Sequence, residues 1–147
     1  MKISDTFTIQ APSQTVWDFL LDIERMSLCV PGVESIEALD ESTYRGNLKV
    51  KVGPISARFS GLVRLLETKP PRRLVASLEA EDKAIASLIK GTFSSELEGA
   101  GSGTKVTYEM DVNLRGRLGQ FGTAVTAATA RKMTAQFADN LRKALEG

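Results

Sequence analysis

Two runs of alternating polarity joined by a tight turn constrain the fold of this chain more than any other feature. Over residues 44–52 every second residue is apolar or small, and polar or charged residues fill the positions between them. After Gly53-Pro54 the alternation resumes over residues 55–65. A period of two residues predicts antiparallel strands with one buried and one solvated face. The buried face includes Gly46 and Gly61, so it either packs tightly on another element or curves around an empty space.

Length and composition predict one soluble globular domain over residues 1–147. With 42% hydrophobic and 25% charged residues, the chain is neither a disordered tail nor a membrane span. Its formal net charge of +1 gives no long-range attraction to nucleic acid. The amino terminus has no signal-peptide stretch, and no run reaches the roughly 20 apolar residues of a spanning helix. We therefore expect a cytoplasmic protein that does not bind nucleic acid.

The lack of histidine removes several kinds of catalytic site. Ser-His-Asp and Cys-His constellations are excluded, and so is the commonest metal ligand. Cys29 is the single cysteine, which rules out an intramolecular disulfide and a thiolate metal cluster. Its apolar neighbours favour a small buried side chain over a reactive thiol. We expect no metal and no cofactor, and an enzyme would have to rely on carboxylates, Tyr, Lys or Arg.

The rest of the chain predicts more strands around a pair of short helices. Residues 2–10 alternate as a first strand, and Pro12 opens a helix for which Ser13 is a plausible cap. A second short helix is predicted over residues 25–30. Residues 84–90 fit either a helix or the start of a strand. Further strands are predicted over residues 33–39, 74–81, 89–97 and 105–115.

The last third of the chain predicts one long helix. From Gln120 to Leu145 Gly122 is the sole helix breaker, and alanines are frequent. A helix of about 25 residues spans nearly 40 Å, long enough to cross the concave face of a curved sheet. The fold class is therefore α+β, with the helices on one side of an antiparallel sheet.

Several local sequences, in this order and spacing, resemble one protein family over nearly the whole chain. They are Val30-Pro31-Gly32-Val33, Lys51-Val52-Gly53-Pro54-Ile55, Phe59-Ser60-Gly61, Gly103-Thr104-Lys105-Val106-Thr107-Tyr108 and Gly116-Arg117-Leu118-Gly119. The chain resembles the CoxG family of carbon monoxide dehydrogenase subunits, within the START-like or Bet v 1-like (SRPBCC, polyketide cyclase-like) superfamily. The resemblance implies a helix-grip fold: a curved antiparallel sheet of about six to seven strands around a long C-terminal helix, with two short helices after strand 1. The segment Asp82–Lys90 departs from the family, which often has a glycine-rich strand there.

The resemblance also implies a function without catalysis. Members of the family are viewed as accessory factors of molybdenum-hydroxylase-type dehydrogenases. Suggested roles are binding an apolar small molecule such as a quinone or lipid, recruiting the enzyme to the inner face of the membrane, and assisting its maturation. Longer members carry a C-terminal tail suited to membrane anchoring. This sequence ends at Gly147, so we expect any peripheral membrane contact to come from the helix or from a partner.

Alternatives stay open at this stage. An enzyme of the polyketide cyclase or aromatase type would use the same cavity, with polar groups such as Tyr44 or Tyr108 pointing into it. A pure interaction module would dock a molybdenum-containing dehydrogenase complex without any ligand. A homodimer is also compatible with the sequence.

If the helix-grip fold holds, the cavity lies between the long helix and the inward strand faces. Ordinary core packing is the simpler explanation for any single lining residue. Small residues such as Ala128 and Thr129 leave room that a filled core would occupy, and they favour a void for the group as a whole. The expected lining residues are Phe59, Val63, Leu78, Phe93, Tyr108, Met110, Val112, Val125, Thr129, Met133 and Phe137.

Charged residues give weaker signals. Glu109 and Asp111 share one strand face but are expected to project outward, so they make a poor catalytic pair. Basic residues cluster in three places. Solvated faces explain most such charges, and a partner or an anionic membrane surface is the alternative. The clusters are Lys49 and Lys51, Arg72 and Arg73, and Arg131 and Lys132 with Arg142 and Lys143.

Overall fold

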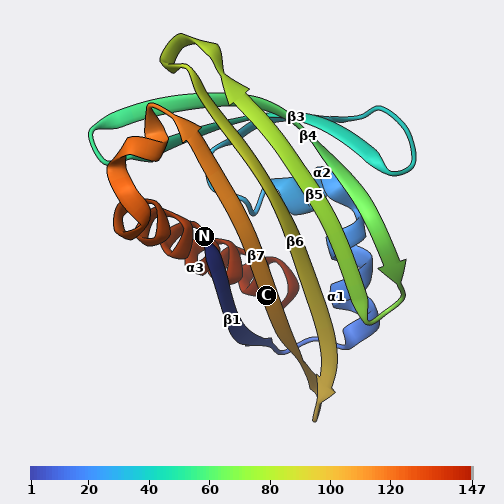
Figure 1. The fold of residues 1–147 in the computed structure, drawn as a ribbon. Helices are drawn as coiled ribbons and strands as arrows, with labels where there is room; N and C mark the ends of the chain where they lie inside the picture. Colours follow the sequence, from blue (N-terminus) through green and yellow to red (C-terminus); the bar gives the residue numbers. More distant parts are fainter. Residues whose placement is uncertain (147) are drawn as a thin grey trace.

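One antiparallel sheet of seven strands wraps around a long helix in the computed structural model, which describes residues 1–146 (Figure 1). The strand order across the sheet is β1-β7-β6-β5-β4-β3-β2. The strands are β1 (Lys2–Ile9), β2 (Val33–Ala38), β3 (Thr43–Val52), β4 (Ile55–Lys69), β5 (Arg73–Asp82), β6 (Ser87–Ala100) and β7 (Gly103–Gly116). The helices are α1 (Ser13–Leu21), α2 (Ile23–Ser27) and α3 (Gly122–Glu146), with short 3-10 turns η1 (Lys83–Ile85) and η2 (Leu118–Phe121).

This architecture confirms the predicted helix-grip fold. Strands β3 and β4 form the expected hairpin, with Val52 opposite Ile55 and Gly46 opposite Gly61. All three helices lie on one side of the sheet, and α3 crosses its concave face (Figure 1). No helix among residues 1–146 is both long and apolar enough to cross a membrane.

The glycines on the inner sheet face allow neighbouring strands to approach closely. A Cβ atom on Gly61 would lie 2.2 Å from the carbonyl oxygen of Glu79 on β5. A Cβ atom on Gly91 would lie 2.9 Å from the carbonyl oxygen of Asp111 on β7. Glycine inside a strand often marks such a bend or close backbone approach. Of the two possibilities left open by the sequence, the structure therefore favours a sheet that curves.

The first helices differ in detail from the prediction. Pro12, not Ser13, is the N-cap residue of α1, and no side chain caps that helix. The hydroxyl of Ser13 instead lies 3.1 Å from that of Thr104 on β7, so the prediction of a Ser13 cap was wrong. Helix α2 begins after Asp22, whose carboxylate accepts the backbone N–H of Arg25, and so starts before the predicted residue 25.

The ambiguous segment 84–90 does not form an α-helix. The carboxylate of Asp82 accepts the backbone N–H of Ala84 and closes the short turn η1. Ala86 then takes a left-handed conformation, with φ of 48°, and β6 starts at Ser87. Pairing of Ser87 with Asp82 on β5 and with Gly116 on β7 makes this segment a strand. Tertiary hydrogen bonding therefore decided between the two local possibilities.

The hydrophobic core is divided into two clusters. The first joins α1 to the C-terminal half of α3 and to β1, β5, β6 and β7; its buried residues are Ile9, Ala11, Val16, Trp17, Phe19, Leu20, Cys29, Leu74, Leu97, Val106 and Leu141. The second joins the β3–β4 hairpin tip to β5 and η2; its buried residues are Val52, Ala57, Phe59, Ala80 and Leu118. The inner face of the sheet between the two clusters therefore lacks a fully packed core.

Candidate ligand cavity

Apolar side chains line the inner surface between the two clusters without being fully covered. The alternation of the strands points Val63, Phe93, Met110 and Val112 inward, yet each stays partly exposed. Met133 on α3 is likewise partly exposed. None of these residues belongs to either buried cluster or to the side chains packed against one. Protein interiors are normally close-packed, so these partly exposed apolar groups mark the least covered part of the inner face.

The structure distributes the other predicted lining residues between the space and its borders. Phe59 is buried in the second cluster, and Leu78 packs against that cluster. Phe137 packs against the first cluster. Thr129 is half-buried, and its hydroxyl donates to the carbonyl of Val125 one turn earlier. Val125 itself is 36% exposed and lies at the outer surface.

Tyr108 stands on the inner face beside two other aromatic rings. Its ring centroid lies 6.2 Å from that of Phe7 and 6.4 Å from that of Phe93, which is nearly parallel to it. Such aromatic contacts hold the Tyr108 ring in place, so its hydroxyl is a polar group among apolar side chains. Ser95 faces Tyr108 from β6 and is also buried. Ser95 was missed from the sequence, although the alternation of β6 identifies it as inward.

Ionisable groups near the interior have structural partners. Asp82 is buried, and its two carboxylate oxygens accept the backbone N–H groups of Arg58 and Ala84, at 2.8 and 3.0 Å. Burial raises the pKa of the Cys29 thiol, which disfavours the reactive thiolate. No group of three metal-binding side chains occurs in residues 1–146. Among the described residues, the candidates for acid–base chemistry on this face of the sheet are the Tyr108 hydroxyl and the carboxyl group of Asp5, which lies opposite Tyr108 on β1.

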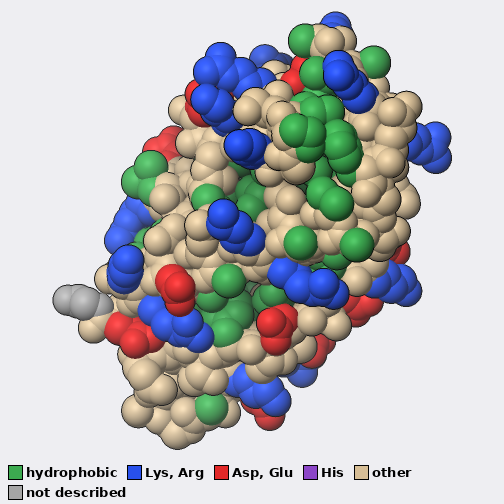
Figure 2. All heavy atoms as spheres, turned by 90° about the vertical axis from the view of Figure 1, so that its left-hand side faces the viewer, with side chains coloured by type: hydrophobic (Ala, Val, Ile, Leu, Met, Phe, Trp, Pro, Cys, Tyr) green, Lys and Arg blue, Asp and Glu red, His purple; other side chains and the backbone are tan. Residues whose placement is uncertain are grey.

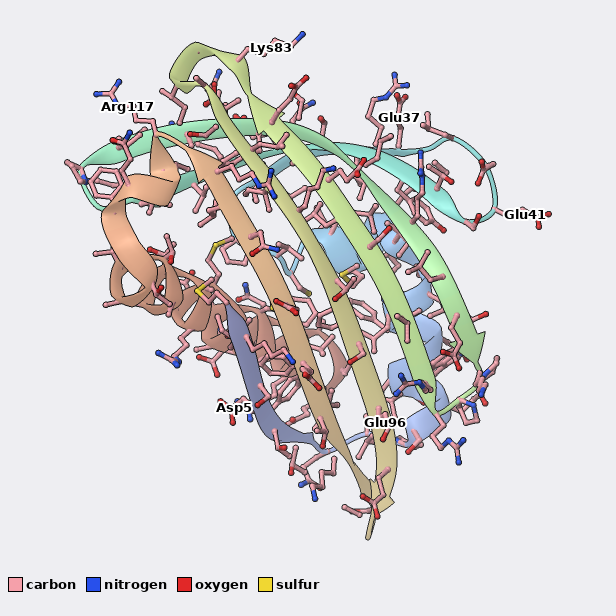
Figure 3. The ribbon with its side chains drawn as sticks, viewed as in Figure 1. Asp5, Glu37, Glu41, Lys83, Glu96 and Arg117 are labelled. Carbon is pink, nitrogen blue, oxygen red and sulfur yellow. The ribbon has the colours of Figure 1, made fainter. Side chains whose placement is uncertain are left out.

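The paired carboxylates on β7 project outward, as expected. Glu109 is exposed, and Asp111 lies 3.8 Å from the N-terminal amine. Figure 3 shows that labelled charged side chains at the edges of the molecule, such as Lys83 and Glu41, extend away from the ribbon. Charge is thus concentrated on the outside of the sheet.

Two surface hollows lie outside the interior space. One, of about 310 Å³, lies on the outer sheet face, where Lys90 and Glu79 form an ion pair of 3.7 Å. The other, of about 350 Å³, lies at the turn between β5 and β6. Their walls come mainly from outward residues, so neither hollow is the predicted cavity.

The connector before α3 is held by Leu118 and Phe121 of η2. Leu118 is fully buried, and its backbone N–H donates to the hydroxyl of Ser87 at 3.1 Å. Gly122 opens α3 with φ of 79°, and a Cβ atom there would meet nothing within 4 Å. Phe121 also packs against the second cluster, and Thr126 and Ala127 in the first turns of α3 are buried, so Gly122 is an open position between packed residues.

Several solved structures share this fold at low sequence identity. A conserved protein from Geobacillus kaustophilus is 17% identical with a TM-score of 0.90, over 97% of this chain and 93% of that chain. A START superfamily protein from Mycobacterium smegmatis is 14% identical with a TM-score of 0.78, over 99% and 97%. The Zhui aromatase/cyclase from Streptomyces sp. R1128 is 16% identical with a TM-score of 0.73, over 99% and 93%. At such identities these likenesses establish the fold alone.

Sequence comparison identifies the family. No curated protein matches the chain. The family model for the CoxG subunit of carbon monoxide dehydrogenase matches residues 6–146, which is nearly the whole sequence. The chain therefore belongs to the CoxG family of carbon monoxide dehydrogenase subunits.

Proposed function

We propose that the protein binds an elongated apolar molecule, of the quinone or lipid class, between the sheet and α3. The division of the core into two clusters carries this proposal, since apolar side chains between them are left partly uncovered. Covering apolar surface is favourable by roughly 25 cal/mol per Å². A ligand that fills the space would therefore be stabilised without any charged partner, and Tyr108 would orient its polar end.

The role we infer is that of an accessory protein without catalysis of its own. Membership of the CoxG family links the chain to carbon monoxide dehydrogenase, so a molybdenum-containing dehydrogenase complex is the proposed partner. The whole chain would act as one cytoplasmic domain. The segment from Gly116 to the first turn of α3 would serve as a lid, with Gly116 and Gly122, both at positive φ, as the hinge positions at its two ends.

Ligand binding can be measured directly. Native mass spectrometry of the purified protein, followed by titration with ubiquinone and menaquinone analogues and fatty acids, would report occupancy. Trp17, the single tryptophan, lies in the first cluster and provides an intrinsic fluorescence signal. The absence of binding across this panel would refute the proposal.

A matched pair of variants locates the binding site. Met110→Trp adds bulk to the inner face, and Glu109→Trp adds the same side chain to the outer face of β7. We expect Met110→Trp to lower the bound fraction at least tenfold in native mass spectrometry, whereas Glu109→Trp should leave it unchanged. Equal binding by both variants would place the ligand elsewhere.

A cyclase or aromatase activity is the second candidate. The inward position of Tyr108 favours it, because a fixed phenol can donate a proton to a bound polyketide. The test is turnover of a polyketide substrate analogue by the wild type and by Tyr108→Phe. Turnover that is lost in Tyr108→Phe would support this candidate, and binding without turnover would support the carrier.

A further inference from the structure

Three polar side chains lie next to one another across the inner face of the sheet, at the border of the first cluster. Asp5 on β1 pairs with Tyr108 on β7, and Tyr108 pairs with Ser95 on β6. Directly opposite residues of an antiparallel pair have Cβ atoms about 4.5–5.5 Å apart. The three side chains therefore form a continuous strip of oxygen-bearing groups across three strands. We call Asp5, Tyr108 and Ser95 the polar row.

The two hydroxyl groups of the polar row are buried without a hydrogen-bond partner in the described chain. Tyr108 is 7% exposed and Ser95 is 3% exposed, and neither hydroxyl bonds to another described residue. No side-chain nitrogen or oxygen of residues 1–146 is both sealed from solvent and unpaired. Each hydroxyl therefore opens onto space that a small polar group can reach. Because buried polar groups are normally hydrogen-bonded, this pair is suited to a partner that enters that space.

Asp5 adds a negative charge to the polar row. One of its carboxylate oxygens accepts the backbone N–H of Thr6 at 2.7 Å, and Asp5 forms no ion pair within the described chain. Arg142, whose guanidinium lies over the ring of Phe7, is itself paired with Asp139 at 3.1 Å. An inward charge on an edge strand can serve only to prevent pairing with another strand. That explanation accounts for Asp5 but not for the two unpaired hydroxyl groups beside it.

The polar row runs from the outside of the molecule into the interior. Asp5 is exposed on the edge strand β1, whereas Ser95 is buried two strands further in. Next to the row on the same face, Met110 and Phe93 pair with each other and begin the partly exposed apolar surface. Figure 2 faces the side of the molecule on which β1 and α3 lie, and it shows hydrophobic side chains set between charged ones. A molecule with one polar end and an apolar tail therefore fits here, with its tail along Met110 and Phe93.

We propose that the polar row binds the hydroxyl group of an alcohol or phenol at the end of the apolar ligand, a step that rests on the proposed function. The carboxylate of Asp5 accepts hydrogen bonds, whereas the hydroxyls of Tyr108 and Ser95 each have a hydrogen to donate. A ligand hydroxyl has one hydrogen and two lone pairs, so it satisfies all three groups at once. Within the quinone class, the reduced hydroquinone carries such hydroxyl groups and the oxidised quinone does not.

Other polar ends match the polar row less well. A carboxylate has no hydrogen for Asp5 and is repelled by its charge. An ammonium group has no lone pair for the hydroxyls of Tyr108 and Ser95. A carbonyl group accepts from these hydroxyls but leaves Asp5 without a donor. The polar row is therefore expected to select its ligand by the polar end and not by the tail alone.

Competition between ligands of equal chain length tests this selection. The purified protein would be incubated at neutral pH with an equimolar mixture of perdeuterated 1-dodecanol, dodecanoic acid and dodecylamine, and native mass spectrometry would separate the three complexes by mass. The wild type should take up the alcohol about tenfold more than either competitor, because hydrogen bonds to a charged group are stronger than neutral ones. Tyr108→Phe should lower the bound fraction of the alcohol several-fold.

A pair of variants isolates the contribution of Asp5. Asp5→Asn keeps an acceptor for the backbone of Thr6 but offers an amide N–H to a ligand carboxylate, so it should lose most of the preference for the alcohol over dodecanoic acid. Glu109→Gln removes the same charge from the outer face of β7 and should keep the selectivity of the wild type.

The outcomes separate this proposal from the proposed function. Equal uptake of the alcohol and the acid by the wild type, or equal selectivity of Asp5→Asn and Glu109→Gln, would overturn the polar row and leave the carrier function standing. If the wild type bound none of the three ligands, the carrier function would be refuted and the polar row with it.

Discussion

Replacing Gly61 by alanine tests whether the close approach of β4 and β5 produces the curvature of the sheet. The new Cβ atom would lie 2.2 Å from the carbonyl oxygen of Glu79 and 2.6 Å from the Cβ of Ala80. Real Cβ atoms essentially never come within 3.0 Å of another heavy atom. Both contacts involve atoms fixed to the backbone of β5, so no rotamer change can relieve them.

The expected cost follows from this geometry. Overpacking in a rigid interior costs typically 1–3 kcal/mol, and a clash with backbone belongs at the upper end of that range, so we expect about 3 kcal/mol. This is a large part of the roughly 5–15 kcal/mol by which a domain is stable. Gly99→Ala is the matched control in β6, because a Cβ atom there meets nothing within 4 Å. Its effect should lie between zero and a gain of about 0.5 kcal/mol.

Urea denaturation, followed by circular dichroism and Trp17 fluorescence, measures both free energies of unfolding. The reasoning predicts a lower denaturation midpoint for Gly61→Ala with little change in slope. If Gly61→Ala were as stable as Gly99→Ala, the two strands would not approach as described. The explanation of the small residues on the inner face would then be wrong.

Three further predictions concern the rest of the structure. Leu141→Ala should lower the free energy of unfolding by about 2–5 kcal/mol, because this side chain is fully buried in the first cluster. In the same denaturation experiment, the control Leu28→Ala, at an 85% exposed position, should change this free energy by less than about 0.5 kcal/mol. Asp82→Ala should lower the free energy of unfolding by about 2 kcal/mol or more, since it leaves the backbone N–H groups of Arg58 and Ala84 without their acceptor. If it lowered this free energy no more than Glu81→Ala does at an exposed position, Asp82 would not have this role. At pH 8, Cys29 should react with a disulfide reagent much more slowly in the native protein than in urea, because burial both shields the thiol and raises its pKa. Equal reaction rates in the two states would show that Cys29 is accessible in the native protein.

The hairpin shows how much of the fold can be predicted from the sequence. Alternation over residues 44–65 predicted both strands, their inner faces and their turn, because the period of a strand maps sequence directly onto its two faces. The alanine-rich run after Gln120, with few helix breakers, predicted the helix across the sheet, and the family motifs agreed with it. The predicted cap at Ser13 was wrong, and residues 84–90 could not be assigned from local sequence, because contacts with Thr104 and with the neighbouring strands decide these two places.

The candidate site could be predicted only in part. Period-two alternation identified Val63, Phe93 and Met110 as inward, and the structure places them between the two clusters. Alternation could not distinguish them from Phe59, which is also inward but buried in a cluster. That difference depends on which elements pack over each part of the sheet.

By itself, the sequence determined the class of fold, the family and the absence of histidine chemistry, since these depend on residue identity and local period. Only the tertiary structure decided that the core is divided, because α1 and η2 cover the two ends of the inner face and leave its middle partly open. The tertiary structure also brought the turn of the β3–β4 hairpin against Phe121 and Val125, which lie far from it in the chain. Both results arise from long-range packing, which no local pattern of residues records.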